Sequence, residues 1–511
     1  MLARVFSSSL IGIDPYLVEV EVNVEGHAFR YSTVGLPELA VRESKERVIS
    51  AIKNSGYKFP PKAYTINLAP ADIKKEGSAF DLPIAIGILA ALGHVIHEDL
   101  DDYVLLGELS LDGTLRPVKG ALPSAVGVHE CKMKGLILPR QNAREAAVTG
   151  DIDVIQVDTL LEAILFLNGE KYIKPLEVDA KLLFSEAQSY QVDLADVRGQ
   201  AHVKRALEVA AAGGHNVLMI GPPGSGKTML AKRFPTILPQ MTLDEALETT
   251  KIHSIAGLVK TEGLVATRPF RSPHHTISDA ALVGGGRIPR PGEVSLAHHG
   301  VLFLDELPEF QKNVLEVMRQ PLENTDVTIS RASMSLTYPA NFILLSAMNP
   351  CPCGYSSDPR HECTCSSIGI QKYMAKISGP LLDRIDLHID VPAIPFEELS
   401  AKQDGETSQR VRERVQLARN IQINRFEAES NIHSNADMPP KMIRTICGID
   451  AESSELLKTA ISSLGLSARA YDRILKVSRT IADLGESTRI TAEHLSEAIQ
   501  YRTLDRQLWM T

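Results

Sequence analysis

The stretch that most constrains this chain is HNVLMIGPPGSGKT at residues 215–228. It runs from an apolar segment into the pattern G-x-x-x-x-G-K-[ST], which joins a strand to a helix in proteins that bind nucleotide phosphates. The glycines let backbone N–H groups surround phosphate oxygens, Lys227 would reach the β- and γ-phosphates, and the Thr228 hydroxyl would ligate Mg²⁺. A chance glycine-rich turn is the alternative, which the flanking strand and helix patterns disfavour. The expected phosphate loop comprises Gly221, Pro222, Pro223, Gly224, Ser225, Gly226, Lys227 and Thr228.

Two further apolar runs end in polar residues suited to hydrolysis. VLFLDE at 301–306 reads as a buried strand that ends in Asp305, expected to hold Mg²⁺ through water, and Glu306, expected to polarise the attacking water. NFILLSAMN ends in Asn349, whose amide could orient the same water. Short buried strands that alternate with helices indicate a parallel sheet covered on both faces. We therefore expect an α/β ATPase core that uses ATP and Mg²⁺.

An arginine follows an apolar turn in GPLLDRIDLHI, residues 379–389. In this position Arg384 could reach the γ-phosphate bound by a neighbouring subunit and stabilise charge in the transition state. A surface salt bridge is the competing interpretation. The residues alone leave both interpretations of Arg384 open.

The length of 511 residues allows two to four domains. Residues 1–170 mix strand and helix patterns, 171–194 are polar and aperiodic like a linker, 195–397 form the expected ATPase core, and 398–511 show helical spacing only, as in a helical lid. Within the first segment we expect strands at 17–24, 64–69, 103–109 and 135–139, and helices at 41–52, 81–92 and 121–131.

The overall composition limits the partners. A formal net charge of −9 argues against a uniformly basic surface, so any polyanion must be gripped locally. The most apolar run, residues 82–96, is broken by glycines and falls short of the roughly 20 residues that span a bilayer, so no membrane partner is expected. Six cysteines without a secretory pattern indicate a reducing compartment, and we expect the cytoplasm.

The motifs together resemble a known family. VRGQAHVKRALEVAAAGGHNVLMIGPPGSGKT, VLFLDE, ILLSAMNPCPCG and GPLLDRIDLH are similar to the AAA+ ATPases of the magnesium-chelatase type and, most closely, to the bacterial ComM/YifB proteins. The resemblance implies that Arg384 is the arginine finger, that Arg469 is the second sensor of the lid, and that Gly199 and Gln200 pack on the adenine. A finger that acts on the next subunit implies a homo-oligomeric ring, a hexamer, in which an isolated chain is nearly inactive.

Two segments are expected to project into the channel of such a ring. In related chelatases and replicative helicases these are an insertion, here residues 268–300, and a hairpin before the Asn349 strand, here residues 326–339. Their arginines would make a positive channel that fits DNA, although they could instead pair with acidic groups of the adjacent subunit. The arginines concerned are Arg268, Arg271, Arg287, Arg290 and Arg331.

Two pairs of adjacent histidines, His274–His275 and His298–His299, lie in the same insertion. Neighbouring residues are expected to point apart, and paired ligands on a helix stand at i and i+4. We therefore do not expect a metal ion at these histidines.

Four cysteines fall within NPCPCGYSSDPRHECTCS, residues 349–366. Two C-x-C pairs separated by nine residues could complete a tetrahedral zinc site, and His361 could replace one thiol. Reduced thiols and a disulfide are the alternatives. The expected ligands are Cys351, Cys353, Cys363 and Cys365.

The N-terminal segment resembles the proteolytic domain of Lon proteases, on KKEGSAFDLPIAIGILAA at 74–91 and the stretch 107–139. That domain uses a serine and a lysine, but their positions fall here on Ala79 and Leu122. Ser78 and Lys119 are displaced from these positions. We expect a Lon-like fold without peptidase activity.

Three functions are consistent with these features. The first is an ATP-driven ring that translocates on DNA and, by resemblance to ComM, moves branched junctions as a helicase in natural transformation. The second is a chelatase motor that drives metal insertion into a tetrapyrrole. The third is a protein-remodelling ATPase with a degenerate protease domain.

Overall fold

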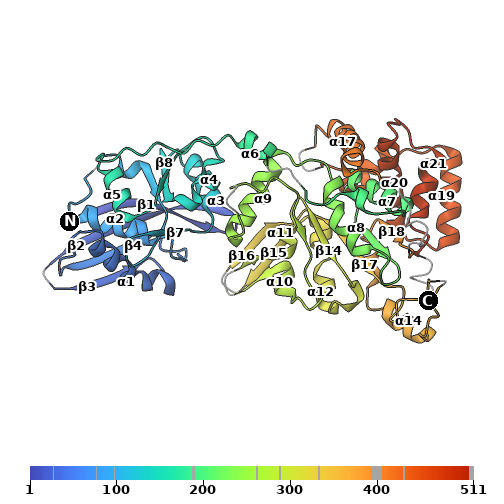
Figure 1. Ribbon diagram of the computed structural model, residues 1–511, viewed down its shortest axis with the longest axis horizontal. Coiled ribbons are helices and arrows are strands. Elements are labelled where there is room, and N and C mark those ends of the chain that lie inside the picture. Colours follow the sequence, from blue (N-terminus) through green and yellow to red (C-terminus); the bar gives the residue numbers. More distant parts are fainter. Residues whose placement is uncertain are drawn as a thin grey trace. The chain divides into compact units, whose positions relative to one another are not determined.

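The computed structural model describes residues 1–26, 28–75, 77–96, 98–186, 190–259, 263–286, 289–331, 334–358, 360–393, 405–429 and 432–505. They form two compact units, residues 1–188 with 242–266, and residues 189–241 with 267–511. Figure 1 shows both units in sequence colours. Within the described residues no helix is long and apolar enough to cross a membrane.

The first unit is built on a mixed sheet of order β3-β4-β2-β1-β5-β8-β9. The sheet begins with a long antiparallel pair, in which Val18, Val20 and Val22 are fully buried and alternate with polar residues, as a half-buried strand requires. The strands are β1 (Leu2–Ile11), β2 (Asp14–Glu25), β3 (Arg30–Val34), β4 (Ala63–Ala69), β5 (Tyr103–Leu105), β8 (Gly135–Pro139) and β9 (Asp153–Val157), with a small pair, β6 (Glu108–Leu109) and β7 (Leu115–Arg116).

The expected helices of this unit are present with bounds shifted by one or two residues. They are α1 (Leu39–Asn54), α2 (Asp81–Ala91) and α3 (Ala121–Glu130), followed by α4 (Arg140–Ala147), α5 (Leu160–Leu167) and α6 (Ala180–Glu186). The strand expected at 103–109 is two short strands, β5 and β6, because the chain leaves the main sheet after Leu105.

A helix that follows the phosphate loop in sequence packs with the first unit. Residues 242–266, which the sequence analysis placed inside the ATPase core, contain α9 (Leu243–Ala256), and this helix contacts α3. The Ser254 hydroxyl donates to the buried carboxylate of Glu145, which also accepts the backbone N–H of Leu122 at 3.0 Å. Burial raises the pKa of Glu145. The chain therefore crosses between the units three times.

The second unit contains a five-stranded sheet of order β11-β14-β17-β10-β18, in which all strand pairs are parallel. This confirms the expected α/β core with a parallel sheet. The strands are β11 (Phe270–Arg271), β14 (Val301–Leu304), β17 (Ile343–Met348), β10 (Val217–Ile220) and β18 (Leu387–Asp390). Its helices are α7 (Ala201–Gly213), α8 (Lys227–Arg233), α10 (Asp279–Val283), α11 (Glu293–Leu296), α12 (Lys312–Val317), α13 (Pro321–Asn324), α14 (Ser367–Met374) and α15 (Gly379–Leu382).

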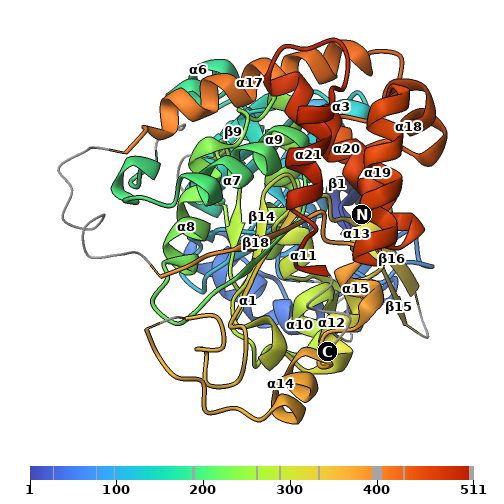
Figure 2. The same ribbon diagram turned by 90° about the vertical axis from the view of Figure 1, so that its right-hand side faces the viewer.

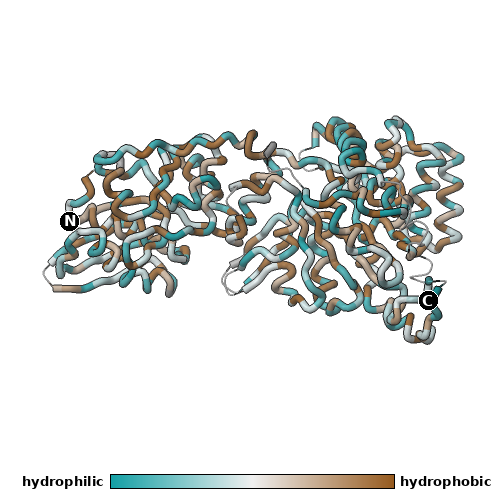
Figure 3. Tube along the Cα trace, in the orientation of Figure 1, coloured by the Kyte–Doolittle hydropathy of each residue, from teal (hydrophilic) through white to brown (hydrophobic). Residues whose placement is uncertain are grey.

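The C-terminal segment is helical, as expected. It comprises α17 (Ser408–Arg425), α18 (Pro440–Ile446), α19 (Ala451–Leu464), α20 (Ala468–Leu484) and α21 (Ala492–Gln500), of which the last three lie side by side in Figure 2. Ser467 accepts the backbone N–H of Ala470 and so caps α20. Figure 3 shows α17 as a mostly hydrophilic helix, yet its buried Val411 and Val415 join the same hydrophobic core as Val217 of the sheet. The C-terminal helices and the parallel sheet thus share one core.

This unit also contains two small hairpins. The insertion after β11 contains β12 (Gly284–Gly285) paired with β13 (Arg290–Pro291), and the hairpin expected at 326–339 is β15 (Asp326–Arg331) paired with β16 (Met334–Pro339).

Candidate functional site

The phosphate loop turns sharply between β10 and α8. Gly224 and Gly226 have φ angles of 76° and 89°, in the left-handed region that favours glycine. A Cβ at Gly221 would lie 2.1 Å from the carbonyl oxygen of Val391, which leaves no room for any other residue there. Around Gly224, by contrast, no atom lies within 4 Å of such a Cβ, so the crest of the loop is open to a ligand.

Lys227 points into this loop. Its Nζ donates to the carbonyl oxygens of Gly221 at 2.7 Å and Pro222 at 2.9 Å and to Oδ1 of Asn349 at 3.2 Å. Burial lowers the pKa of Lys227, and the nearby carboxylate of Asp305 opposes that effect. The ammonium is thus held at the mouth of the loop by oxygen acceptors that phosphate oxygens of ATP can replace.

The residues present fit a magnesium ion. The Thr228 hydroxyl, at the start of α8, donates to Oδ2 of Asp305 at 2.7 Å, just beyond the end of β14. A hydroxyl and a carboxylate oxygen are hard ligands of the type that Mg²⁺ takes beside nucleotide phosphates. Bound there, Mg²⁺ would neutralise charge on the β- and γ-phosphates.

Glu306 has a backbone conformation that turns the chain away from the strand. Its φ and ψ are 54° and 47°, an uncommon region for a non-glycine residue, and its N–H donates to Oδ1 of Asp305 at 3.0 Å. The side chain is 56% exposed, with Oε2 3.4 Å from Nδ1 of His275. The carboxylate is therefore accessible to water, and it has a neighbour that the sequence analysis did not assign.

Gln200 lies against the phosphate loop. Gly199 and Gln200 both have left-handed φ angles, 61° and 52°, which direct the chain into α7. Nε2 of Gln200 donates to the carbonyl oxygens of Ser225 at 2.9 Å and Pro392 at 3.1 Å. Its Oε1 is buried and has no hydrogen-bond partner among the described residues. An acceptor in this state can bind a donor group of a nucleotide, which fits the expected place of the base.

Arg384 and Arg469 lie at the other edge of the sheet. The phosphate loop, Asp305 and Asn349 follow the carboxyl ends of β10, β14 and β17, whereas Arg384 precedes the amino end of β18, and its carbonyl accepts the side-chain N–H of Asn216 at 3.2 Å. Arg469 lines a hollow of about 600 Å³ at that same edge. Since a strand of four residues spans roughly 13 Å, neither guanidinium faces the phosphate loop of its own chain.

Arg384 is not a freely projecting side chain. It is 4% exposed, and its guanidinium donates to the carboxylate of Glu323 and to the carbonyl oxygen of Pro380. Burial lowers the pKa of Arg384, whereas the charge of Glu323 raises it. Glu323 itself is 51% exposed, so the ion pair reaches the surface. The structure thus shows Arg384 in a salt bridge, and its role as an arginine finger stays a prediction.

The five arginines expected in a DNA channel separate into four groups. Arg271 makes a two-point ion pair with Glu293, at 2.6 and 2.7 Å, and is therefore engaged within the chain. Arg268 donates to the backbone carbonyls of Pro239 and His299 and holds the fold of the core. Arg287 lies outside the described residues. Arg290 and Arg331 are exposed, one on each small hairpin.

The adjacent histidines do not point apart, and that expectation is wrong. The ring centroids of His274 and His275 are 4.1 Å apart, and those of His298 and His299 are 3.9 Å apart. The alternation of a strand does not apply, because both pairs lie outside strands and His299 has a φ of 56°. Nδ1 of His298 accepts the backbone N–H of Asn341 at 3.0 Å, so this ring supports the start of the Asn349 strand.

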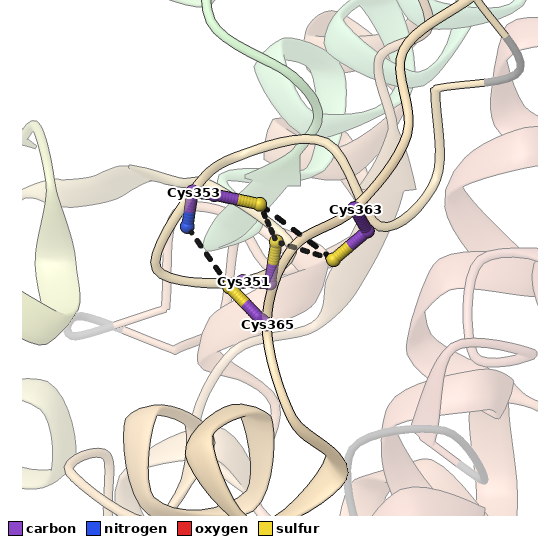
Figure 4. Close-up of side chains that lie close together, drawn as sticks. All are labelled: Cys351, Cys353, Cys363 and Cys365. Carbon is purple, nitrogen blue, oxygen red and sulfur yellow. Dashed lines mark hydrogen bonds between the residues drawn. The ribbon is translucent and has the colours of Figure 1, made fainter.

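The four cysteines of the loop after β17 converge (Figure 4). Their Sγ atoms all lie within 4.8 Å of one another, with Cys351 3.3 Å from Cys353 and 3.7 Å from Cys363, and Cys353 3.6 Å from Cys363. The S–S bond of a disulfide is about 2.05 Å. A tetrahedron with Zn–S bonds of about 2.3 Å has edges of about 3.8 Å, so the donor set fits Zn²⁺.

His361 does not complete this group. Its Nδ1 lies 3.0 Å from Oδ2 of Asp358, and its ring stacks on Tyr355 with centroids 4.7 Å apart. The backbone N–H of Tyr355 lowers the pKa of the Cys353 thiol to about 6.

The cysteine loop also contacts the nucleotide site, because a Cβ at Gly354 would lie 2.5 Å from Cδ of Pro223.

Among the described residues of the first unit, Ser78 and Lys119 are each bonded to another group. The Ser78 hydroxyl donates to the carboxylate of Glu108, and Nζ of Lys119 donates to the carbonyl oxygen of Ala256 at 3.5 Å. Leu122, at the position expected for the lysine, is fully buried. These side chains therefore have separate structural contacts.

Comparison with known proteins identifies relatives along the whole chain. Residues 193–399 match the family described as magnesium chelatase, subunit ChlI, residues 20–142 match subunit ChlI of Mg-chelatase, and residues 405–502 match its C-terminal family. The chain is 45% identical to competence protein ComM of Haemophilus influenzae and 43% identical to the uncharacterized protein YifB of Escherichia coli, each over 509 residues that cover 99% of this chain and 98% of the relative. It is also 29% identical to the Lon protease of Chloroflexus aurantiacus over 167 residues, 30% of this chain and 20% of that one.

Proposed function

This chain belongs to the ComM/YifB family of magnesium-chelatase-type AAA+ ATPases, and we propose that it forms a homohexameric ring in the cytoplasm that couples ATP hydrolysis to translocation on DNA. Its substrates would be branched or three-stranded DNA junctions, which the ring moves as a branch-migration helicase so that a donor strand is integrated during natural transformation. The name of the Haemophilus relative, a competence protein, supports this role.

The proposed ring is supported by the positions of two arginines, the expected arginine finger and the expected second sensor. Arg384 and Arg469 lie at the amino edge of the sheet, opposite the phosphate loop of the same chain. A guanidinium at that edge can reach ATP only if the loop belongs to another subunit. Charge stabilisation by an arginine supplied from a neighbour makes hydrolysis a property of the assembled ring.

Each residue of the carboxyl edge has a role in the proposed hydrolysis. Lys227 binds the β- and γ-phosphates, and Thr228 with Asp305 would hold Mg²⁺. Glu306, exposed to water, acts as the base for the attacking water, while Asn349, bonded to Lys227, orients it. Arg384 of the next subunit then stabilises the charge that develops on the transferred phosphoryl group.

The proposed DNA contact rests on Arg290 and Arg331. Both are exposed and lie on the two small hairpins, and a ring would repeat them around its channel. Such a local positive surface can hold a phosphate backbone although the whole chain carries a net charge of −9.

The experiment that tests DNA as the substrate is the ATPase rate with single-stranded DNA, forked DNA, unfolded protein or porphyrin. We expect stimulation by DNA alone, lost in Arg331→Ala and Arg290→Ala and retained in Arg116→Ala, which removes an exposed arginine of the first unit. All variants should bind nucleotide normally. Stimulation by unfolded protein or porphyrin but not by DNA would contradict the proposal. Such a result would favour a protein-remodelling ATPase or a chelatase motor, respectively.

The cysteine loop is proposed to hold one structural zinc ion per chain. The four Sγ atoms supply a complete tetrahedral donor set, and the loop lies on the phosphate loop through Gly354. Metal quantification on purified protein should give about one equivalent of zinc, reduced in Cys353→Ser and unchanged in Cys131→Ser, an exposed cysteine elsewhere. Wild-type protein without zinc would remove this part of the proposal.

We propose that the first unit serves in binding or in ring assembly and that it does not cleave peptides. Ser78 and Lys119 are bonded to other groups, and Ala79 and Leu122 cannot supply a nucleophile or a base. Peptidase activity on unfolded substrates that disappeared in Ser78→Ala would contradict this assignment.

A further inference from the structure

The inference concerns Glu323, to which the proposed reaction gives no role. Glu323 lies on α13, and its carboxylate forms the ion pair with the guanidinium of Arg384. The two residues are 61 positions apart in sequence, so the fold brings this carboxylate and this guanidinium together. An anion that reaches Arg384 from a neighbouring subunit must therefore first displace Glu323.

The backbone around Glu323 holds its carboxylate at this place. Pro321, at the start of α13, is buried, and its carbonyl oxygen accepts the backbone N–H of Thr325 at 3.1 Å. The carbonyl oxygen of Thr325 in turn accepts the backbone N–H of Ala340 at 2.8 Å, which ties the end of the helix to the segment before β17. The side chain of Glu323 is 51% exposed. The carboxylate can thus turn toward solvent while its backbone stays fixed.

Arg384 depends on an anion at this place. Its side chain is 4% exposed, and its buried Nε has no hydrogen-bond partner among the described residues. A buried guanidinium without a counter-ion is strongly unfavourable, and burial lowers the pKa of Arg384. The carboxylate of Asp386, two residues later, is ion-paired with Arg473. Glu323 therefore supplies the negative charge that Arg384 needs within its own chain.

Two further arginines lie around the same carboxylate. Glu323 lines a hollow of about 700 Å³ together with Arg319, and it also lines the hollow of about 600 Å³ that contains Arg469. Besides burial, the charges of both arginines lower the pKa of Arg384. Arg319 is also paired with Glu316, at 2.8 Å. Guanidinium groups bind carboxylate and phosphate oxygens with the same geometry, so the place of the Glu323 carboxylate also suits a phosphate group.

We propose that Glu323 is a placeholder anion, which neutralises Arg384 before ATP is present, yields the guanidinium to the γ-phosphate held by the next subunit, and recaptures it when the phosphate leaves. This inference rests on the proposed ring, in which Arg384 acts on the nucleotide of a neighbour. A phosphate group carries more charge and more acceptor oxygens than a carboxylate, so ATP wins the exchange. The carboxylate stays tethered beside the guanidinium, and its high local concentration favours its return. Glu323 is thus a positioning residue that acts through Arg384.

The test compares the assembled wild-type ring with Glu323→Gln, which keeps the shape of the side chain and removes its charge. Glu455→Gln is the matched control, because Glu455 is an exposed carboxylate of α19 that pairs with Lys458 at 3.2 Å. The KM for ATP, kcat and the rate of phosphate release in a single turnover are measured. We expect Glu323→Gln to lower the KM about tenfold, because a hydrogen bond between charged groups no longer has to be broken. Phosphate release should become slower, because no carboxylate competes for Arg384.

Glu323→Asp, whose shorter side chain weakens the ion pair and keeps the charge, should lower the KM by a smaller factor. Glu455→Gln should match the wild type in all three quantities. If Glu323 only supported the fold or aimed Arg384, both Glu323 variants would show an unchanged or raised KM, and that result overturns the inference.

The proposed ring has a separate test in Arg384→Ala. Undiminished hydrolysis in Arg384→Ala would contradict the shared catalytic centre and, with it, the role of Glu323. Loss of hydrolysis in Arg384→Ala together with an unchanged KM in Glu323→Gln would reject the placeholder role alone and leave the ring in place.

Discussion

The contact of the cysteine loop with the phosphate loop predicts a defined effect of Gly354→Ala. Gly354 has a φ of 90°, so alanine there costs about 1 kcal/mol of backbone strain. Its Cβ would lie 2.5 Å from Cδ of Pro223, whereas ordinary contacts begin near 3.4 Å, so one of the two loops must shift by roughly 1 Å. A displacement of this size at a catalytic group can reduce the rate by up to about a hundredfold. We expect kcat to fall between about tenfold and a hundredfold.

Gly465→Ala is the matched control, because Gly465 also has a positive φ, 67°, but no atom lies within 4 Å of its added Cβ. Both variants carry the backbone strain and should lower the urea midpoint of unfolding, Gly354→Ala by more because of its contact with Pro223, and only Gly354→Ala should impair ATP hydrolysis. Equal ATPase rates for the two variants would show that the cysteine loop does not support the phosphate loop.

Further predictions address the nucleotide site, the zinc ion and the lid. Lys227→Ala should lose nucleotide binding, whereas Glu306→Gln should bind ATP and accumulate an ATP-bound ring; normal hydrolysis by Glu306→Gln would refute its role as the base. Removing zinc with a chelator should slow ATP hydrolysis, and adding zinc back should restore the rate. An unaffected rate would show that the cysteine loop has no influence on catalysis. Burial opposes ionisation of Asp386, but Arg473, His215 and the N–H of Asn216 outweigh it and hold its pKa far below the ordinary value. This stabilisation is therefore present above about pH 4 and is lost as the pH falls. Asp386→Asn should cost about 3 kcal/mol at pH 7 and flatten that acid dependence in urea unfolding; an unchanged midpoint would contradict the assignment.

The nucleotide-binding edge was largely predictable because it depends on local patterns. Three apolar runs that form strands of the parallel sheet are each followed by a residue that the chemistry needs, so Lys227, Asp305 and Asn349 meet at one edge without any knowledge of distant contacts. The hairpin at 326–339, which the resemblance implied, is present as β15 paired with β16. The convergence of the four cysteine sulfur atoms followed from their spacing in one loop.

Other features depend on residues far apart in sequence. Nothing in the local pattern indicates that Arg384 pairs with Glu323, or that Arg271 pairs with Glu293 instead of facing a channel. The docking of α9 on the first unit was hidden because its capping box and helical spacing are ordinary. The contact of His275 with Glu306 could be expected only by knowing that β11 is the neighbour of β14 in the sheet.

The most direct test of the central claim is a mixing experiment with two inactive chains. Arg384→Ala retains the phosphate loop, and Lys227→Ala retains the arginine at the opposite edge. In a random one-to-one mixture, about a quarter of the interfaces join an intact loop to an intact arginine. We expect each variant alone to be nearly inactive and the reassembled mixture to regain ATP hydrolysis. A mixture as inactive as its components, or full activity of Arg384→Ala as a monomer, would contradict a catalytic centre shared between subunits.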